Sequence, residues 1–296
     1  MVEITFGSHD TGEVVLHYAE MGRSDAPLIV CLHGFPEYWV AWKAVMAELA
    51  GGFRLVAPDQ RGFNLSSRPV EVEAYRGRHL VADIASLADH LSPERPFVLA
   101  GHDWGASIAY AYAFRHAARL SHLVIANGVH PVCFQRAILE DPEQRQASQY
   151  MRLLRSDRAE HLLSEDGYRR LMGMIEGFST TAFMDDETRA AYIETWSRPG
   201  ALSAMLNWYR ASPILVPDPG AAADMPPELS KGDFTLPMPH LLLWGEADQA
   251  LRPSTFAGLQ EFAPALTVRR FADAGHWILH ERPREVADAI RTFLHG

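Results

Sequence analysis

The sequence predicts an α/β fold, with a mostly parallel, doubly wound sheet and an inserted helical cap. Nearly continuous apolar runs recur along the chain, as in strands that are buried on both faces of a parallel sheet. Segments with helical spacing separate these runs, so strand and helix alternate. One long stretch, residues 131–233, interrupts this alternation with helical patterns alone.

Composition and charge describe an ordinary globular protein. The 296 residues are 48% hydrophobic and 22% charged, which fits neither a disordered nor a membrane class. The formal net charge of −10 argues against a nucleic-acid surface, and a small neutral substrate fits this balance better. The only partner that we expect is therefore a small-molecule substrate, and a homodimer is compatible with the sequence.

Targeting and cysteine patterns point to the cytoplasm. The chain contains neither a signal-peptide pattern nor a run of 18 apolar residues, so we expect a cytoplasmic protein with no membrane partner. Cys31 and Cys133 lie far apart without metal-ligand spacing. We expect both to be buried thiols rather than a disulfide.

The first half of the chain supplies most of the predicted sheet. Residues 2–19 alternate apolar and polar on both sides of a turn at 9–12, which predicts two antiparallel strands at an exposed edge. Apolar runs then predict buried strands at 28–32, 55–57, 97–100 and 123–126. Helical spacing predicts the intervening helices at 39–50, 75–91 and 104–116.

The second half begins with the helical block and then returns to the sheet. Strands resume at 239–244 and 266–271, and an amphipathic helix follows at 284–294. A helical block between two strands predicts a cap over the carboxyl edge of the sheet, where ligands bind in such folds. We therefore expect a core domain of residues 1–130 and 234–296 and a helical cap, or lid, at 131–233.

Asp103 lies at the tip of a predicted strand-turn-helix segment. Gly101 and Gly105 flank it, as the small residues of a nucleophile elbow do where strand and helix pass closely. A carboxylate at this tip suits attack on a saturated carbon, which leaves an ester on the enzyme, rather than serine-type acyl transfer. The alternative is an ordinary helix N-cap, for which aspartate is also favoured.

Two further polar residues follow predicted strands. Asp248 lies in the loop after 239–244, and His276 lies in the loop after 266–271. The order nucleophile, acid, histidine is the one expected of an elbow with its two catalytic partners. A loop histidine can be purely structural, and Asp248 can cap a helix near residue 253. Their coincidence with Asp103 at three strand ends favours a catalytic set.

Backbone amides next to the elbow can stabilise negative charge. Segment 33–37 directly follows the strand at 28–32, and a loop there can direct an N–H at a developing oxyanion. The residue after the nucleophile supplies a second donor. We therefore expect an oxyanion hole formed by the amides of Phe35 and Trp104. The alternative is a plain turn.

Taken together, these motifs resemble those of the α/β-hydrolase-fold epoxide hydrolases. The motifs are His33-Gly34-Phe35-Pro36-Glu37, Gly101-His102-Asp103-Trp104-Gly105, Trp244-Gly245-x-x-Asp248 and Gly275-His276. The resemblance covers residues 28–294. It implies the α/β-hydrolase fold and two cap tyrosines that face the epoxide oxygen. By position these are Tyr150 and Tyr209, with Tyr168 and Tyr192 in reserve.

The resemblance implies an epoxide hydrolase that converts a small or medium apolar epoxide to a vicinal diol. Asp103 forms an alkyl ester while Tyr150 and Tyr209 stabilise the opening oxygen, and water activated by His276, with Asp248 behind it, hydrolyses that ester. A phenol with a pKa of about 10 stays protonated at neutral pH and suits the donor role. No cofactor and no metal are expected.

The nearest alternative is a haloalkane or haloacetate dehalogenase, which uses the same aspartate nucleophile. Phe35 stands where many haloalkane dehalogenases have asparagine, and Trp104 stands where haloacetate dehalogenases usually have arginine. Both departures favour an epoxide substrate. An esterase is a further alternative, as is a binding protein that has lost catalysis, although the complete set of Asp103, Asp248 and His276 argues against the latter.

Overall fold

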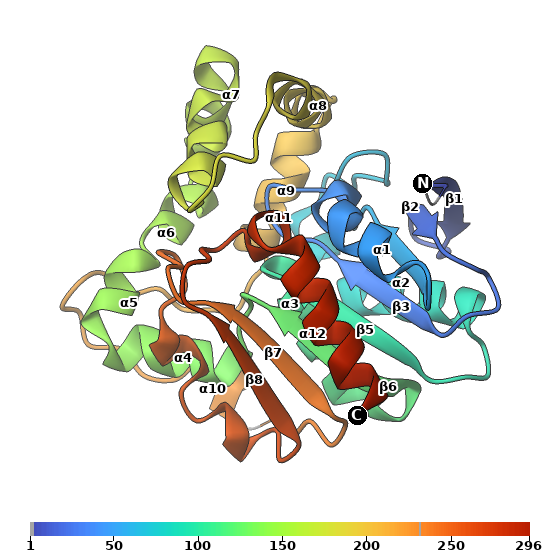
Figure 1. Ribbon diagram of the computed structural model, residues 1–296. Helices are drawn as coiled ribbons and strands as arrows, with labels where there is room; N and C mark the ends of the chain where they lie inside the picture. The colour runs from blue at the N-terminus through green and yellow to red at the C-terminus, as the bar shows by residue number, and fades with distance from the viewer. Residues whose placement is uncertain (1–2, 231) are drawn as a thin grey trace.

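An eight-stranded sheet organises the molecule, in the strand order β1-β2-β4-β3-β5-β6-β7-β8 (Figure 1). The computed structural model describes residues 3–230 and 232–296. Strands β1 and β2 pair antiparallel, β2 pairs antiparallel with β4, and the other neighbours are parallel. The strands are β1 (Thr5–Asp10), β2 (Val15–Met21), β3 (Leu28–Leu32), β4 (Arg54–Pro58), β5 (Phe97–His102), β6 (Leu120–Ala126), β7 (His240–Gly245) and β8 (Leu266–Phe271). The predicted edge hairpin and mostly parallel sheet are confirmed.

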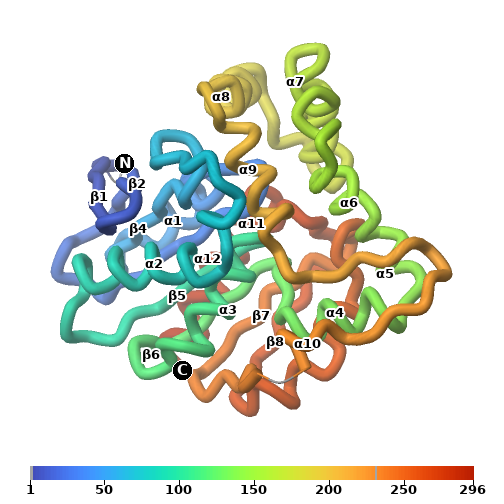
Figure 2. Tube along the Cα trace, turned by 180° about the vertical axis from the view of Figure 1, so that it is seen from behind, coloured from blue at the N-terminus to red at the C-terminus, as the bar shows by residue number. Residues whose placement is uncertain are grey.

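Helices cover both faces of the sheet, as a doubly wound fold requires. One face carries α1 (Lys43–Leu49), α11 (Ile278–Glu281) and α12 (Pro283–His295), which lie in front in Figure 1. The opposite face carries α2 (Gly77–Leu91) and α3 (Trp104–His116), as Figure 2 shows from behind. Each face buries its own apolar cluster.

Short 3-10 turns account for the small differences from the predicted helix bounds. The predicted helix at 39–50 starts as a 3-10 turn before α1, and Tyr75 belongs to a separate turn because Arg76 is extended (φ −63°, ψ 145°). The turns are η1 (Trp39–Trp42), η2 (Val72–Tyr75), η3 (Ala117–Arg119), η4 (Pro253–Phe256) and η5 (Leu259–Glu261).

The segment between β6 and β7, called the helical insertion below, contains helices and connecting loops. Its helices are α4 (Pro131–Glu140), α5 (Pro142–Ala147), α6 (Tyr150–Arg155), α7 (Ala159–Gly177), α8 (Asp186–Ser197), α9 (Ala201–Arg210) and α10 (Pro227–Ser230). The prolines at 217, 219, 226 and 227 and the glycine at 220 predict a loop at the end of this segment, whereas the structure adds the short helix α10. In Figure 1, α7 and α8 stand above the sheet.

Helix α7 consists of two helical segments that meet at residues 165–168, called the tip of α7 from here on. Asp166, Gly167 and Tyr168 have left-handed backbone angles, with φ of 50°, 64° and 65°. Asp166 and Gly167 are exposed, and α7 forms the highest part of the molecule in Figure 1. This tip therefore lies at the surface and away from the sheet.

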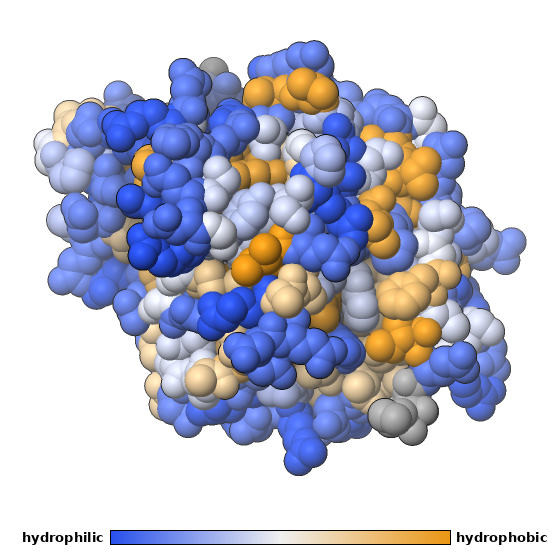
Figure 3. Space-filling view, turned by 90° about the horizontal axis from the view of Figure 1, so that it is seen from above, coloured by the Kyte–Doolittle hydropathy of each residue, from blue (hydrophilic) through white to orange (hydrophobic). Residues whose placement is uncertain are grey.

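The surface is mostly hydrophilic when viewed from above, with apolar side chains in separate patches (Figure 3). Its exposed large apolar residues include Val70, which is 86% exposed, and Phe6 and Leu65. Cys31 and Cys133 are free and buried, as predicted. Within residues 3–230 and 232–296, none of the helices has the length and apolar character needed to span a membrane.

Candidate active site

Asp103 occupies a sharp turn between β5 and α3. Its backbone has φ 50° and ψ −120°, a conformation that an aspartate adopts only where the surrounding structure imposes it. The carboxylate forms no capping bond with α3; instead, Oδ1 accepts a hydrogen bond of 2.7 Å from the backbone N–H of Phe35. The structure therefore disagrees with the N-cap alternative and leaves a partly exposed carboxylate at the turn.

Glycines make this turn possible because neighbouring backbone leaves no room for a side chain. A Cβ atom on Gly101 would lie 2.6 Å from the carbonyl oxygen of Gly105. A Cβ on Gly105 would collide with the carbonyl oxygen of Leu32, and one on Gly34 would collide with the Asp103 carboxylate. The two flanking glycines thus let β5, α3 and the end of β3 approach closely.

Asp248 and His276 form a buried pair in the loops after β7 and β8. Oδ2 of Asp248 lies 2.8 Å from Nδ1 of His276. Oδ1 of Asp248 accepts hydrogen bonds from the backbone N–H groups of Ala250 and Leu251, at 2.8 and 2.9 Å. Although burial disfavours its charge, the pKa of Asp248 is lowered by His276, by the Leu251 N–H and by the side chain of Asn127. Asp248 is thus an ionised acceptor rather than the cap of a helix near residue 253.

His276 lies between two carboxylates. Its Nε2 is 3.7 Å from Oδ2 of Asp103, and its Nδ1 faces Asp248. Burial opposes a charged imidazole, but the negative charges of Asp248 and Asp103 outweigh it and raise the pKa of His276 to about 10. The structure therefore brings together the three residues that the sequence predicts as a set.

Asn127 is a site residue that the sequence analysis missed. It follows β6 directly, has φ 34°, and donates a 2.7 Å hydrogen bond from Nδ2 to Oδ2 of Asp248. Its Oδ1 accepts a hydrogen bond from the N–H of Gly245 at 2.8 Å. Asn127 therefore fixes the Asp248 carboxylate from the neighbouring strand. The available signal was an asparagine at the carboxyl end of a buried strand.

A second buried polar set lies next to the Asp103–His276 pair. Oε1 of Glu37 accepts hydrogen bonds of 2.6 Å from the Tyr192 hydroxyl and from Nε2 of His280. Although burial opposes its charge, His280, His102 and Tyr192 lower the pKa of Glu37 to about 2. His102 has Nδ1 at 3.6 Å from Glu37 and donates from Nε2 to the carbonyl oxygen of His276 at 2.9 Å. This set supports the backbone of the histidine loop.

The histidine loop also contacts the helical insertion. The N–H of His276 donates to the carbonyl oxygen of Phe178 at 3.3 Å. The buried carboxylate of Glu281 accepts from the N–H of Gly275 at 2.6 Å and from the hydroxyl of Thr180 at 2.7 Å. The loop after β8 and the connection from α7 to α8 are therefore held by a shared acceptor.

The backbone amides of Phe35 and Trp104 are the two predicted donors of the oxyanion hole. The Phe35 amide already donates to Oδ1 of Asp103. The Trp104 amide belongs to the first turn of α3, where N–H groups have no carbonyl partner within the helix. Both are therefore suited to donate to negative charge that develops on this carboxyl group.

Tyr150 and Tyr209 come from two helices of the insertion and meet near Asp103. The centroids of their rings are 6.3 Å apart. The Tyr209 ring packs edge-on against Trp104 and Phe35, with centroid distances of 5.0 and 5.1 Å. Burial and then the charge of Asp103 raise the pKa of Tyr150. Burial, Tyr150 and Asp103 raise the pKa of Tyr209 well above its usual value. Both phenols thus remain protonated hydrogen-bond donors.

The two reserve tyrosines have other hydrogen-bond partners. The Tyr168 hydroxyl donates to the carbonyl oxygen of Trp196 at 3.2 Å, and the Tyr192 hydroxyl donates to Glu37. His130 is buried against Phe262 and lies within 3.2 Å of the carbonyl oxygen of Phe234. Among residues 3–230 and 232–296, no three His, Cys, Asp or Glu side chains gather in a group that could hold a metal ion.

Comparisons with known proteins agree on one type of fold. Residues 27–283 match the family model described as alpha/beta hydrolase fold. The chain is 35% identical over 96% of its length to the AB hydrolase superfamily protein YfhM of Bacillus subtilis (strain 168), and 96% of that protein is covered. It is 34% identical over 96% of its length to Epoxide hydrolase 3 of Xenopus tropicalis, covering 76% of that protein.

A solved structure from metagenomes of hot environments, described as a novel epoxide hydrolase of the alpha/beta hydrolases superfamily, is also similar. It superposes with a TM-score of 0.88 at 36% identity, and the match covers 100% of this chain and 99% of that one. The similarity therefore extends over the sheet and the helical insertion alike.

Proposed function

This chain belongs to the α/β-hydrolase family and, within it, to the epoxide hydrolases, and from that premise we propose that Asp103 opens the epoxide as a nucleophile. The chain is a hydrolase that acts on epoxides. The addition of water to an epoxide gives a vicinal diol, and the proposed route divides this addition into two half-reactions.

The first half-reaction forms a covalent ester. An Asp103 oxygen attacks one epoxide carbon, the bond from that carbon to the ring oxygen breaks, and a hydroxyalkyl ester results. The opening oxygen leaves as an alkoxide and needs a proton or strong hydrogen bonds as its bond breaks. Tyr150 and Tyr209 supply these, since their raised pKa values keep both phenols protonated.

The second half-reaction hydrolyses this ester. His276 removes a proton from water through Nε2 while Asp248 holds Nδ1, and the resulting hydroxide attacks the carboxyl carbon of Asp103. The amides of Phe35 and Trp104 stabilise the tetrahedral oxyanion. Collapse releases the diol, and the protons on the Asp103 carboxyl group and on His276 restore the diol hydroxyl and the phenol.

Loss of negative charge on Asp103 links the two half-reactions. In the free protein, two carboxylates outweigh the effect of burial and raise the pKa of His276 to about 10, so the imidazole already carries a proton near neutral pH and cannot accept another. Once Asp103 is an ester, one of these charges is gone, so the pKa of His276 falls, the imidazolium gives its proton to solvent, and the neutral imidazole can accept a proton from water. When hydrolysis restores the Asp103 carboxylate, the imidazole takes up a proton from solvent again. The base therefore becomes effective when its substrate, the ester, is present.

The helical insertion supports the substrate class. We assign residues 131–233 as a cap, or lid, over the core formed by 1–130 and 234–296. Its two phenols provide hydroxyl donors for an oxygen leaving group, and the aromatic rings of Phe35, Trp104 and Tyr209 provide apolar walls. A small or medium apolar epoxide fits these surroundings.

One observation carries this proposal: a carboxylate at the elbow accepts from the Phe35 amide and faces the imidazole of His276. A carboxylate in that position can bond to carbon, and the same imidazole can then direct water at the carboxyl group.

The test is intact-protein mass spectrometry of the His276→Gln variant mixed with styrene oxide. This variant retains Asp103 but lacks the base, so the ester should accumulate with the full mass of the epoxide. Peptide mapping should place it on Asp103. An alkyl bromide serves as the comparison substrate, because an adduct that has lost bromide indicates dehalogenation instead. The absence of any adduct would contradict the covalent route.

A further inference from the structure

Helix α9, which carries Tyr209, is attached directly to a loop of the core. The indole N–H of Trp208 donates to the backbone carbonyl oxygen of Arg61 at 2.9 Å. One residue earlier, Nδ2 of Asn207 donates to the carbonyl oxygen of Val70 at 3.2 Å. Consecutive residues of α9 therefore bind the segment 61–70, which follows β4.

Trp208 connects this attachment to the site. Its ring packs edge-on against Phe63 at 5.4 Å and against Trp104 at 6.0 Å. Trp104 in turn packs against Tyr209, the next residue of α9. Trp208 is 1% exposed, so it has no space to move without displacing one of these rings.

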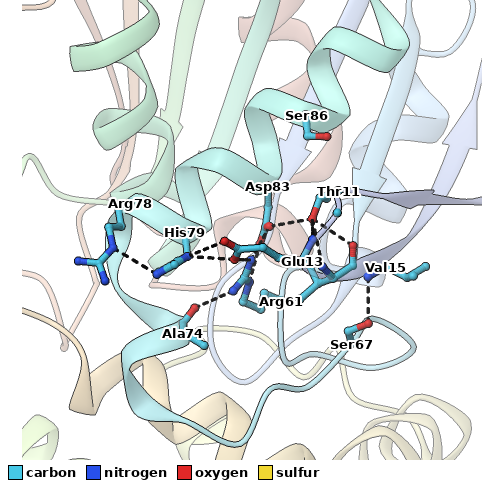
Figure 4. A network of polar contacts seen from close by, with 12 residues as sticks. Thr11, Glu13, Val15, Arg61, Ser67, Ala74, Arg78, His79, Asp83 and Ser86 are labelled. Carbon is cyan, nitrogen blue, oxygen red and sulfur yellow. Dashed lines mark hydrogen bonds and ion pairs between the residues drawn. The ribbon is translucent and has the colours of Figure 1, made fainter.

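The carbonyl group that Trp208 binds belongs to a residue held on several sides (Figure 4). The Arg61 side chain forms two hydrogen bonds with Asp83 of α2, at 2.7 and 2.8 Å. It also pairs with Glu13, from the turn between β1 and β2, at 3.0 Å. A fourth bond of 2.9 Å goes to the carbonyl oxygen of Ala74.

The hydrogen bonds of Arg61 fix the position of its backbone more than they stabilise the fold. The side chains of Arg61 and Asp83 are 2% and 4% exposed, and removing such charges from water offsets much of their attraction. What a bidentate pair supplies is geometry, because the guanidinium fork accepts few orientations. The Arg61 backbone is thus a fixed reference point against which α9 can be set.

We propose that Trp208 is a positioning residue for Tyr209, and that Arg61 holds the carbonyl group on which this positioning depends. The inference rests on the proposed function, in which Tyr209 donates to the epoxide oxygen. Tyr209 donates only while the epoxide ring opens. A looser α9 misplaces this donor and therefore slows ester formation. Ester hydrolysis, which uses His276 and the core amides, keeps its rate.

The test is the Trp208→Phe variant, which removes the indole N–H and keeps an aromatic ring. Rapid-quench mass spectrometry with styrene oxide measures the rate constants for ester formation on Asp103 and for ester loss. We expect ester formation to slow by about 10- to 100-fold, the scale of a small displacement of a catalytic group. The rate constant for ester loss is expected to be unchanged.

The Ser254→Ala variant is the control. The Ser254 hydroxyl of η4 also joins the core to the insertion, donating to Oδ2 of Asp141 at 2.6 Å. We expect this control to lose thermal stability but to form the ester at the normal rate. Equal slowing in both variants, or slowing of both steps in Trp208→Phe, would overturn the assignment, because either result indicates general loosening.

Two more variants complete the test. Arg61→Lys keeps the positive charge but loses the bidentate guanidinium pairing with Asp83. Its effect on Tyr209 passes through the bond between Trp208 and the residue 61 carbonyl group. The Arg61→Lys/Trp208→Phe double variant should therefore form the ester no more slowly than Trp208→Phe. Additive effects would refute the shared route. Tyr209→Phe separates this proposal from the proposed function. If Tyr209→Phe forms the ester at the normal rate, the proposed role of Tyr209 fails. If Tyr209→Phe forms the ester slowly but Trp208→Phe forms it at the normal rate, only the positioning role of Trp208 fails.

Discussion

The sheet edge and the helical insertion hold their parts of the site by different means. Asp103, Asp248 and His276 follow β5, β7 and β8, and short hydrogen bonds to backbone groups or to one another fix each side chain. Tyr150 and Tyr209 instead belong to α6 and α9, and packing of aromatic rings fixes them. The first region depends on strand register, and the second on how helices dock.

This difference corresponds to a division of labour in the proposed mechanism. The sheet-edge residues form and hydrolyse the ester, whereas the insertion residues assist ring opening alone. Changes at the sheet edge should therefore block turnover, and changes in the insertion should slow one step while leaving the other intact.

Replacing the nucleophile should have the largest effect. In Asp103→Ala no ester can form, so we expect turnover of styrene oxide to fall by on the order of 10⁶-fold, as when a hydrolase loses its nucleophile. The fold should survive, because the Asp103 side chain does not cap α3. Diol formation is measured by chromatography, and folding by thermal unfolding.

The same variant reports on the charge around His276. Removal of the Asp103 carboxylate should lower the pKa of His276 below about 10, since this charge is one of its causes. NMR titration of the imidazole measures the change. An unchanged titration, or substantial residual turnover, would mean that Asp103 does not act as proposed.

Replacing the phenols should have a smaller and more selective effect. Tyr209→Phe and Tyr150→Phe each remove a donor to the opening oxygen, and we expect each to slow ester formation by about 100-fold, the order assigned to one general acid. The rate constant for ester hydrolysis should not change in either variant. Rapid-quench mass spectrometry resolves the two steps.

Tyr168→Phe is the matched control for the phenols, because its hydroxyl binds the backbone of Trp196. It should form the ester at the normal rate. If Tyr150→Phe or Tyr209→Phe slows hydrolysis as much as formation, the division between insertion and sheet edge does not hold.

The smallest effect concerns pH. His276 must be neutral to accept a proton, so ester hydrolysis should rise by about tenfold per pH unit until the pKa of the ester form is passed. That pKa should lie below the free-protein value of about 10, because esterification removes one of the two carboxylates that outweigh burial. Single-turnover decay of the ester across a pH series gives the midpoint. A midpoint equal to the free-protein value would contradict the coupling.

Most of the fold was predictable because buried parallel strands appear in the sequence as apolar runs. The predicted strand at 28–32 and helix at 104–116 have the observed bounds of β3 and α3. The short helix α10 was missed because consecutive prolines in the sequence indicate a loop, whereas Pro227 suits a first helical position. Local pattern thus predicted these long buried elements with their bounds but missed a helix of 4 residues.

The site was only partly predictable, and the missing part depends on sheet order. Asp103, Asp248 and His276 follow recognisable strands, so their proximity could be expected before the structure. Asn127 binds Asp248 only because β6 lies next to β7 in the sheet, and no local pattern states this neighbour relation. The partnership of Glu37 with Tyr192 likewise joins residues 155 positions apart.

The interrupted tip of α7 offers a practical handle on the protein. Asp166 and Gly167 are exposed and already have left-handed backbone angles, so an added peptide there needs no rearrangement of packed helix. A peptide inserted between Asp166 and Gly167, carrying a dye or a surface linker, would lie far from the strands. The enzyme could then be immobilised or labelled in a way that keeps both chemical steps intact.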